Sequence, residues 1–519
     1  MNGAQALIRT LVGCGVDTCF MNPGTSEMHF VAALDSVPEM RGVLCLFEGV
    51  ATGAADGYAR MADRPASVLL HLGPGLGNGL ANLHNARKGK VPVVNIVGDH
   101  ATYHKRFNAQ LESDIETVAR NVSSWVKRSM RPEDVGADGA EAVTAAMGPP
   151  GQVATLILPA DASWLEGGIV APPRPFAKRN PAAKDRIEKI AAILRGKEQC
   201  TLFLGGTAVR RRGLIAASRI AKAGGAKMMC ETFPARLERG AGIPPIERLA
   251  YLAEFATMQL AGTKHLIIAD TKSPVSFFAY PGKASDLVPE GCEVHMLASD
   301  TDDAPAALEA LADALDAPKD AAALQPASPP GRPAGSLTAE SVCQAIGAML
   351  PEGAIVSDEG NTTTSLYGPM LTAGAPPHDW LCLTGGAIGQ GLPVATGAAA
   401  AARDRKVVCM ESDGSALYTI QSLWTQAREG LNVVNVIFNN KSYAVLNMEL
   451  NRVGAAASGP KAKEMLDLHR PDLDFVEISK GMGVPATRAT SAEEFCAQFA
   501  RAIAEPGPAL IEAMVPSLV

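Results

Sequence analysis

Short apolar strand patterns alternate with amphipathic helix patterns along most of the chain, and this alternation restricts the fold more than any other feature of the sequence. Such alternation predicts parallel sheets that are covered by helices on both faces. Two proline-rich stretches, 171–185 and 318–335, interrupt it and are typical of interdomain linkers. Because domains of roughly 100 to 200 residues are usual, we predict three doubly wound α/β domains over 1–170, 186–317 and 336–519.

Each predicted domain contains three clear strand patterns. The expected strands are 18–21, 67–72 and 91–97 in the first domain, 201–205, 227–230 and 265–269 in the second, and 354–357, 407–410 and 433–438 in the third. One helix is expected over 4–12. Another is expected over 417–427, where one apolar stripe is formed by Leu417, Ile420, Leu423, Trp424 and Ala427.

Charge, hydropathy and cysteine content narrow the classes of partner. The net charge of −7 provides no basic surface for nucleic acid or an anionic membrane. No window reaches about 18 uninterrupted apolar residues, and the N-terminus lacks the pattern of a secretion signal. The ten cysteines are scattered without a C-x-x-C pair, as is typical of buried thiols in a reducing compartment. We therefore expect a cytoplasmic protein that acts on small molecules.

The strongest local pattern is Ser412-Asp413-Gly414-Ser415, which is followed by a helix and by a strand that ends at Asn440. Separately these segments would be ordinary turns. In a parallel sheet, however, Asp413 and Asn440 would lie at the carboxyl ends of nearby strands, where such sheets bind ligands. Carboxylate and amide oxygens suit Mg²⁺ that is shared with phosphates. Gly414 allows close backbone approach, and Ser415 adds a donor for the phosphates.

This arrangement resembles the thiamine diphosphate (ThDP) fingerprint of the superfamily that contains pyruvate decarboxylase, acetolactate synthase and benzoylformate decarboxylase. The usual pattern runs from Gly-Asp-Gly to Asn-Asn, and here Ser412 replaces the first glycine. The resemblance covers the whole chain in the domain order pyrimidine-binding, central and diphosphate-binding. It implies that Asp413, the Asn440 side chain and the Ser442 carbonyl bind Mg²⁺.

Further cofactor contacts follow from the same resemblance. Asn361 and Thr362 look like a second diphosphate contact, and Tyr418 matches a phosphate-binding tyrosine of benzoylformate decarboxylase. The glycine-rich run 385–393 is similar to the loop beneath the cofactor. In this loop the Gly386 carbonyl would accept a hydrogen bond from the cofactor amino group, and Ile388 would bend the cofactor into a V; without the flanking motif, Ile388 would simply be a core residue.

Glu48 follows an apolar strand and opens a helix, as does the glutamate that activates the aminopyrimidine in this family. A glutamate in a first helical turn is otherwise an ordinary partner of the helix dipole. The metal site lies in the third domain, whereas Glu48 lies in the first. In this family paired subunits supply the two halves, so the resemblance implies an obligate homodimer, usually doubled to a homotetramer.

His71 resembles the histidine with which benzoylformate decarboxylase performs acid and base chemistry on its substrate. Thr25 falls where that enzyme has a serine that contacts the substrate carboxylate. The purely structural alternatives are that His71 is an ordinary histidine at a strand end and that Thr25 is a helix N-cap. The chain lacks that enzyme's second histidine in the central domain, and Glu449 stands where a phenyl-packing aromatic is expected. We therefore expect a substrate other than benzoylformate. His100 and His104 follow a strand and have no assigned role.

The resemblance implies a ThDP- and Mg²⁺-dependent enzyme that decarboxylates a 2-oxo acid without oxidation, with carboligation as an accompanying activity. An acetolactate synthase-like carboligase is the alternative, because the two reactions share their early steps. FAD remains possible, although no specific determinant supports it. A dinucleotide-binding protein is suggested only weakly by the glycines of 73–79. A noncatalytic ThDP-binding protein is disfavoured because binding alone needs no activating Glu48.

Overall fold

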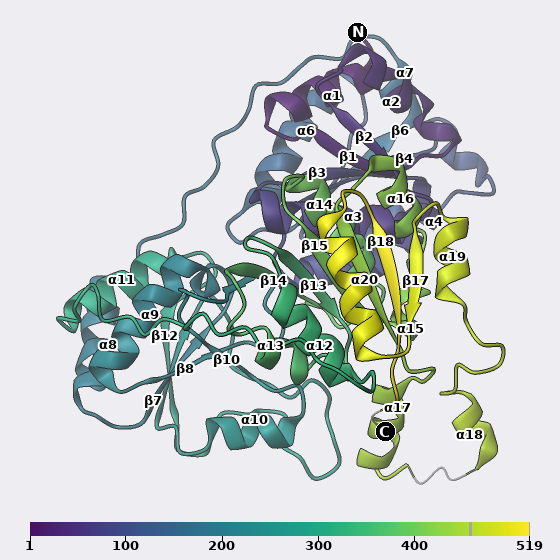
Figure 1. Cartoon of the computed structure of the whole chain (residues 1–519). Coiled ribbons are helices and arrows are strands. Elements are labelled where there is room, and N and C mark those ends of the chain that lie inside the picture. Colours follow the sequence, from purple (N-terminus) through teal and green to yellow (C-terminus); the bar gives the residue numbers. More distant parts are fainter. Residues whose placement is uncertain (456–458, 518–519) are drawn as a thin grey trace.

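The computed structural model describes residues 1–455 and 459–517. Figure 1 shows three α/β units, each built around its own sheet. All strand pairs are parallel except the pair formed by β9 (Leu237–Arg239) and β14 (His378–Cys382). The expected fold of three parallel-sheet α/β domains is therefore confirmed. Among the described residues, no helix combines the length and the apolar character that crossing a membrane requires.

The first sheet has the strand order β2-β1-β3-β4-β6-β5. Its strands are β1 Thr18–Asn22, β2 Arg41–Leu44, β3 Ala66–Leu70, β4 Val93–Asp99, β5 Trp125–Arg128 and β6 Val153–Pro159. Its helices are α1 Gly3–Gly13, α2 Met28–Ala33, α3 Glu48–Ala62, α4 Leu72–Lys88, α5 Ile115–Arg120, α6 Pro132–Met147 and α7 Ala160–Trp164, with short 3-10 turns η1 Thr25–Glu27, η2 Leu34–Ser36 and η3 Lys105–Phe107.

The second sheet has the order β10-β8-β7-β11-β12. Its strands are β7 Cys200–Leu204, β8 Lys227–Cys230, β10 Glu247–Arg248, β11 His265–Ala269 and β12 Glu293–Ala298. The accompanying helices are α8 Lys184–Arg195, α9 Arg211–Gly224, α10 Ala253–Leu260 and α11 Ala304–Ala314, with the 3-10 turn η4 Gly206–Val209.

The third sheet has the order β17-β18-β16-β15-β13-β14-β9. Its other strands are β13 Ile355–Glu359, β15 Val407–Ser412, β16 Val433–Asn439, β17 Ala486–Ala489 and β18 Ala509–Met514. Its helices are α12 Ala339–Met349, α13 Tyr367–Leu371, α14 Gly391–Ala401, α15 Asp413–Ala416, α16 Ser422–Glu429, α17 Ala444–Arg452, α18 Pro460–Glu464, α19 Phe475–Gly481 and α20 Ala492–Ala504.

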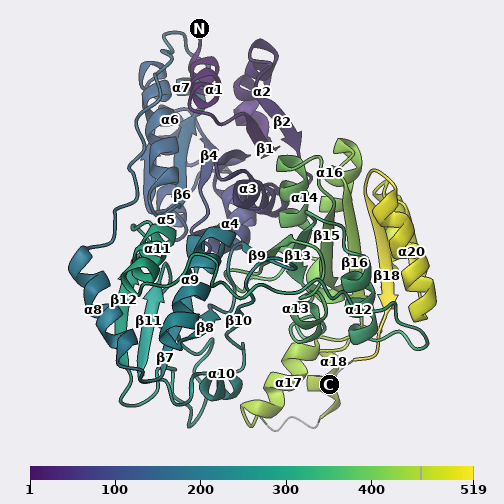
Figure 2. The same ribbon diagram turned by 60° about the vertical axis from the view of Figure 1, so that its left-hand side comes forward.

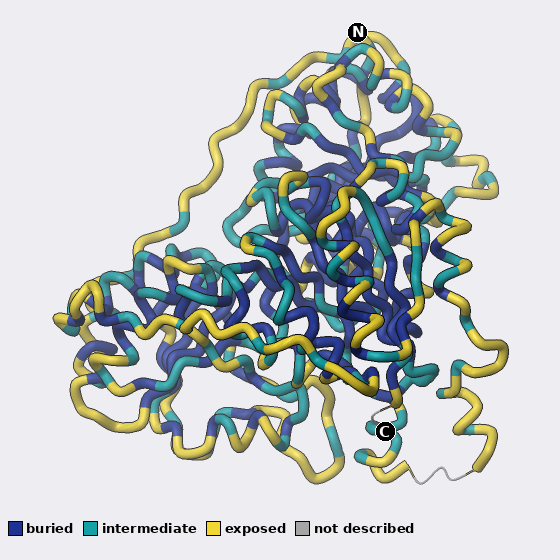
Figure 3. The backbone as a smooth tube through the Cα atoms, in the orientation of Figure 1, coloured by how far each residue is buried: buried dark blue, intermediate teal, exposed yellow. Residues whose placement is uncertain are grey.

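Every strand expected from the sequence is present, with ends shifted by at most two residues. The segments 171–183 and 318–335 contain no helix or named strand, and the first runs along the outside of the molecule (Figure 3). One strand does not stay with its neighbours in the chain. Leu237 of β9 comes from the middle third of the sequence but pairs with Trp380 of β14 at the edge of the third sheet (Figure 2).

The single helix expected over 417–427 is wrong. The chain instead forms α15, a set of turns, and then α16, which begins only at Ser422. The tertiary structure explains the break, since the Thr419 hydroxyl donates to the Gly389 carbonyl at 3.0 Å. A Cβ on Gly389 would lie 2.5 Å from Cβ of Tyr418. This close packing against a distant loop overrides the local helical pattern, and Leu417 is left exposed.

Helices α3 and α14 pack backbone against backbone where the first and third domains meet. A Cβ on Gly57 would lie 2.1 Å from the Val394 carbonyl oxygen, and a Cβ on Gly397 would lie 1.8 Å from that of Ala54. Only glycine permits such an approach at these two positions. The apolar core is accordingly continuous across the two domains.

A buried ion pair lies where the three domains meet. Arg60 binds Asp56 through two hydrogen bonds of 2.7 Å, and both side chains are inaccessible to solvent. Arg60 also donates to the carbonyls of Ala235 and Cys382, which belong to the middle and third parts of the chain. The Gln390 side chain donates to Asp56 at 2.7 Å. This network positions the loop that precedes α14 against α3.

Candidate active site

Asp413 is buried at the start of α15 and reaches the end of the neighbouring strand β16. Its Oδ2 accepts hydrogen bonds from the backbone N–H groups of Asn440 at 3.0 Å and Lys441 at 2.6 Å. Burial raises the pKa of Asp413 above its usual range. The structure thus brings residues 413 and 440 together, because β15 and β16 are adjacent parallel strands that end at the same edge.

The turn after β16 is held by its own side chains. The Asn440 amide oxygen accepts from the Ser442 backbone N–H at 3.0 Å, and Lys441 has a φ of 56°. The Ser442 hydroxyl accepts from Asn447 at 3.0 Å. A carbonyl oxygen has two lone pairs, so the Asn440 oxygen can accept this bond and still bind a cation.

Asn361 links the ends of β13 and β15. Its amide donates to the hydroxyls of Ser412 and Ser415, both at 3.2 Å, and its own φ is 48°. Thr362 follows it and is half-buried. Gly414 faces the Tyr443 ring so closely that a Cβ would lie 2.4 Å from it. The predicted diphosphate residues at 361, 362, 414 and 415 therefore gather at one edge of the third sheet.

The loop 385–391 is fastened by side chains of α4. Asn85 donates to the Ala387 carbonyl at 2.8 Å, and Asn82 donates to that of Gly389 at 3.2 Å. Gly386 has a φ of 76°, and a Cβ there would lie 2.6 Å from the Phe277 ring. Ile388, between these anchors, is half-buried. The loop conformation is consequently set by residues distant in the sequence.

Two buried carboxyl groups, those of Glu359 and Glu411, lie against this loop. Glu359 accepts hydrogen bonds from the backbone N–H groups of Gly389 at 2.8 Å and Gly391. Its neighbour across the sheet is Glu411. Burial raises the pKa of Glu359 to about 7 and that of Glu411 well above its usual value. This pair could not be predicted from the sequence, because carboxylates in apolar strands give no motif of their own.

Glu48 is the first residue of α3 and is 8% exposed. Asn78 of α4 donates to its carboxylate at 3.1 Å. A Cβ on Gly75 would lie 3.2 Å from Glu48 Oε1 and 3.4 Å from His71 Cβ. The structure therefore brings Glu48 and His71 close to the same glycine, and it adds Asn78, which has no expected role from its sequence context.

His71 precedes α4, and its side chain is 21% exposed. Its Nδ1 lies 2.8 Å from Glu27 Oε2 and 3.3 Å from the Ser26 hydroxyl. Glu27 itself is buried and also accepts from the Gly24 backbone N–H at 2.8 Å. Glu27 lies two residues after Thr25, but no motif in the sequence indicated that it would contact His71. Thr25 is exposed, so Ser26 is the hydroxyl nearer to His71.

The structure shows the surroundings of three other residues to which the sequence assigned no role. The Nε2 of His100 is buried without a hydrogen-bond partner among the described residues, and burial lowers the pKa of this imidazole. The His104 ring lies 5.3 Å from it. Glu449 forms an ion pair with Arg452 at 2.6 Å, which also binds Glu254 of the middle domain.

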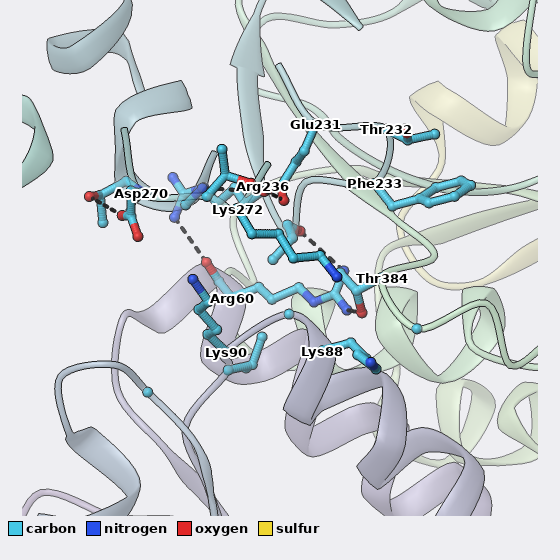
Figure 4. A pocket seen from close by; sticks show the side chains of 18 of the residues that line it. Arg60, Lys88, Lys90, Glu231, Thr232, Phe233, Arg236, Asp270, Lys272 and Thr384 are labelled. Carbon is cyan, nitrogen blue, oxygen red and sulfur yellow. Dashed lines mark hydrogen bonds between the residues drawn. The ribbon is translucent and has the colours of Figure 1, made fainter. Parts of the chain in front are cut away.

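A cavity of about 700 Å³ lies elsewhere, at the carboxyl ends of β7, β8 and β11. Figure 4 shows Lys88 and Lys90 from the first domain on one side and Glu231, Asp270 and Lys272 from the middle domain on the other. The Asp270 carboxylate already accepts from both the N–H and the hydroxyl of Thr207 at 2.8 Å. This acid competes with any phosphate for those donors.

The glycines of 73–79 lie inside helix α4 rather than in a loop before a helix. A dinucleotide fingerprint requires a loop that leads into the helix N-terminus. The weak dinucleotide interpretation therefore loses its structural support.

The comparisons with known proteins identify the family. The model "Thiamine pyrophosphate enzyme, N-terminal TPP binding domain" matches residues 1–119, and "Thiamine pyrophosphate enzyme, C-terminal TPP binding domain" matches 362–513. "Putative acetolactate synthase large subunit IlvX" of Mycobacterium tuberculosis is 61% identical over 100% of both chains. The chain belongs to the thiamine pyrophosphate enzyme family. The resemblance recognised in the sequence is thereby confirmed.

More distant members of the family also align with this ThDP enzyme over nearly its whole length. Benzoylformate decarboxylase of Pseudomonas aeruginosa is 28% identical over 96% of both chains. The solved structure of a ThDP-dependent 4-hydroxybenzoylformate decarboxylase from Rhodococcus jostii RHA1 superposes with a TM-score of 0.84, at 23% identity and over 99% of both chains. The structural match supports the three-domain fold.

The donor groups of the described site suit magnesium and a diphosphate. The buried Asp413 carboxylate and the Asn440 amide supply the hard oxygen ligands that Mg²⁺ prefers. Asn361 and Ser415 add uncharged hydrogen-bonding groups beside them. Gly414 has no side chain of its own, and the Tyr443 ring packs closely against its backbone at this edge.

Proposed function

We propose that this ThDP enzyme decarboxylates a 2-oxo acid without oxidation and depends on Mg²⁺. The observation that carries the proposal is the proximity of Glu48 and His71, since a Cβ on Gly75 would lie 3.2 Å from Glu48 Oε1 and 3.4 Å from His71 Cβ; a carboxyl and an imidazole would therefore serve one site. The Glu27 carboxylate, 2.8 Å from His71, sets the orientation of that imidazole.

The cofactor would be held by the third domain. Asp413, Asn440 and the Ser442 carbonyl would bind Mg²⁺, and the diphosphate would be held by Asn361, Thr362, Gly414, Ser415 and Tyr418. The Gly386 carbonyl and the Ile388 side chain would orient the two rings. When bound, ThDP supplies a nucleophilic carbon and accepts the electrons that decarboxylation releases.

The remaining chemistry belongs to side chains of the first domain. Glu48 would hold a hydrogen bond to the pyrimidine ring of the cofactor, with Asn78 fixing its carboxylate. His71 would donate a proton to the substrate carbonyl oxygen, regain one from solvent, and then donate it to the carbon from which carbon dioxide has left. The Ser26 hydroxyl lies 3.3 Å from His71 Nδ1, and Thr25 precedes it in the chain; both hydroxyls would contact the substrate carboxylate.

We further propose that the active unit is a homodimer, doubled to a homotetramer. Large apolar side chains next to both halves of the site are exposed in the single chain, including Leu46 at 47% and Tyr418 at 53%. Burying such residues against a second copy would remove apolar surface from water. The protein would act in the cytoplasm, where its ten cysteines stay reduced.

An acetolactate synthase-like carboligase is the second candidate, and the name of the 61% identical relative favours it. The ion pair of Glu449 and Arg452 occupies the region where an aromatic residue would pack against a phenyl substrate. It favours a smaller or more polar 2-oxo acid under either function.

The decisive experiment supplies the purified protein with ThDP, Mg²⁺ and a panel of 2-oxo acids. Release of carbon dioxide with an aldehyde as the main product is expected. If pyruvate gives acetolactate as the main product, the decarboxylase proposal is replaced by the carboligase. Flavin fluorescence of the same sample shows whether FAD accompanies the protein.

A further inference from the structure

A group of imidazole and carboxylate side chains lies at the amino end of the middle sheet, opposite the strand ends that line the large cavity. His265 begins β11 and pairs in register with Glu293, which begins β12. His295 follows two residues along β12, so it lies on the same face as Glu293. The two imidazoles are largely buried, with side chains 12% and 8% exposed, whereas the Glu293 side chain is 70% exposed.

The donor atoms form a compact triangle. His265 Nδ1 lies 3.0 Å from His295 Nε2 and 3.8 Å from Glu293 Oε2, and His295 Nε2 lies 3.6 Å from the same oxygen. Donors around a tetrahedral zinc ion are separated by about 3.3 Å, because metal–donor distances are near 2.0–2.2 Å. A point inside this triangle lies about 2.0 Å from all three atoms. The side chains therefore need little movement to coordinate an ion.

The protonation of the imidazoles also fits metal binding. Glu198 lies 3.1 Å from His265 Nε2, so a proton on that nitrogen leaves the lone pair of Nδ1 directed at His295. Metal-binding histidines commonly use a carboxylate in this way.

We propose that His265, His295 and Glu293 bind one divalent transition-metal ion of the zinc class, with water in the remaining coordination position. Imidazole donors distinguish this site from the magnesium site proposed at Asp413, since magnesium prefers oxygen ligands. The ion would join β11 to the edge strand β12 and so stabilise the middle domain, and it would take no part in the reaction. Within the described residues, this is the group of histidine and acidic side chains whose geometry suits a metal.

The test measures zinc binding to the holoenzyme, kept in saturating ThDP and Mg²⁺ so that the active site does not compete. Equilibrium dialysis against zinc chloride should give one bound ion per chain for the wild type. His265→Ala and His295→Ala each remove a ligand and should weaken binding by at least about 10-fold. Glu293→Gln alters an exposed side chain, so it should fold normally and still lose affinity.

His469→Ala is the matched control, because His469 is an exposed histidine paired with Asp467 outside the cluster. Zinc should raise the Tm of the wild type and of this control, but not that of His295→Ala. Steady-state turnover with ThDP should stay unchanged in Glu293→Gln. Failure of the wild type to bind zinc, or full affinity in Glu293→Gln and His295→Ala, would overturn the proposal.

Discussion

The imidazole Nδ1 of His71 lies 2.8 Å from Oε2 of Glu27, and both residues are held over Gly24, where a Cβ would lie 2.1 Å from that nitrogen. A buried carboxylate beside an imidazole orients the ring through their hydrogen bond. Glu27 also passes so close to Gly98 of β4 that a Cβ there would lie 1.7 Å from its carboxylate. The side chains of this pair are thus confined by close packing against the backbone of Gly24 and Gly98.

Replacing Glu27 by Gln should therefore slow turnover by about 10-fold or more while leaving ThDP affinity unchanged. His71→Ala should lower kcat/KM by about 100-fold. Steady-state kinetics and cofactor titration measure the two effects separately. Glu39→Gln, at an exposed position, is the control and should behave as the wild type. Wild-type kinetics in Glu27→Gln would show that the pair is only structural.

Glu48→Gln should retain cofactor binding but lose at least about 99% of turnover, because the amide cannot supply the proton that the pyrimidine ring requires. The substitution preserves the size of the side chain and the hydrogen bond with Asn78. Calorimetry with ThDP and turnover assays on the same preparation separate binding from chemistry. Undiminished turnover would remove Glu48 from the mechanism.

Asp413→Ala should abolish the uptake of ThDP in the presence of Mg²⁺, since it removes the buried carboxylate at the strand end. The control is Asp472→Asn, which changes an exposed acid that pairs with Lys441 of the same turn. Calorimetry with and without Mg²⁺ measures the difference. Magnesium-dependent binding that survives in Asp413→Ala would contradict the proposed metal site.

Arg60→Met should destabilise the protein by about 3–5 kcal/mol, because it leaves the Asp56 carboxylate buried without its partner. Arg120→Met breaks an exposed pair with Glu116 at the same helical spacing and should cost about 0.5 kcal/mol or less. Urea unfolding monitored by circular dichroism compares the two variants. Equal decreases in the free energy of unfolding would mean that burial of the Arg60 pair does not raise its contribution to stability.

His378 makes stability depend on pH. Burial lowers its pKa to about 4, and its Nε2 is buried without a hydrogen-bond partner among the described residues. Between about pH 6.5, the usual value of an unfolded histidine, and pH 4, the unfolded chain binds a proton that the folded chain does not. This contribution to stability is therefore complete above pH 6.5 and is lost as the pH falls toward 4.

His378→Asn should flatten the decline of the free energy of unfolding between pH 6.5 and 4, as measured by urea titrations at several pH values. His469→Asn, at an exposed position, should keep the wild-type slope. A wild-type slope in His378→Asn would assign the acid sensitivity to other groups.

Much of the fold could be predicted from the sequence because the relevant signals are local. A buried strand such as β16 is a continuous apolar run, and parallel strands with intervening helices leave few alternative topologies. The proximity of Asp413 and Asn440 could be predicted for the same reason, since each directly follows a recognisable strand. The sequence by itself therefore determined the α/β class, the strand positions and the meeting of these two residues.

Only the tertiary structure decided which distant groups meet. Glu27 and His71 are 44 positions apart, and the two histidines of the proposed zinc site become neighbours only through strand register. The helix expected over 417–427 breaks because Gly389 packs against Tyr418, and β9 leaves its own segment to complete the third sheet. Hydrogen bonds and close packing between distant segments depend on the final arrangement of the backbone, and no local pattern encodes them.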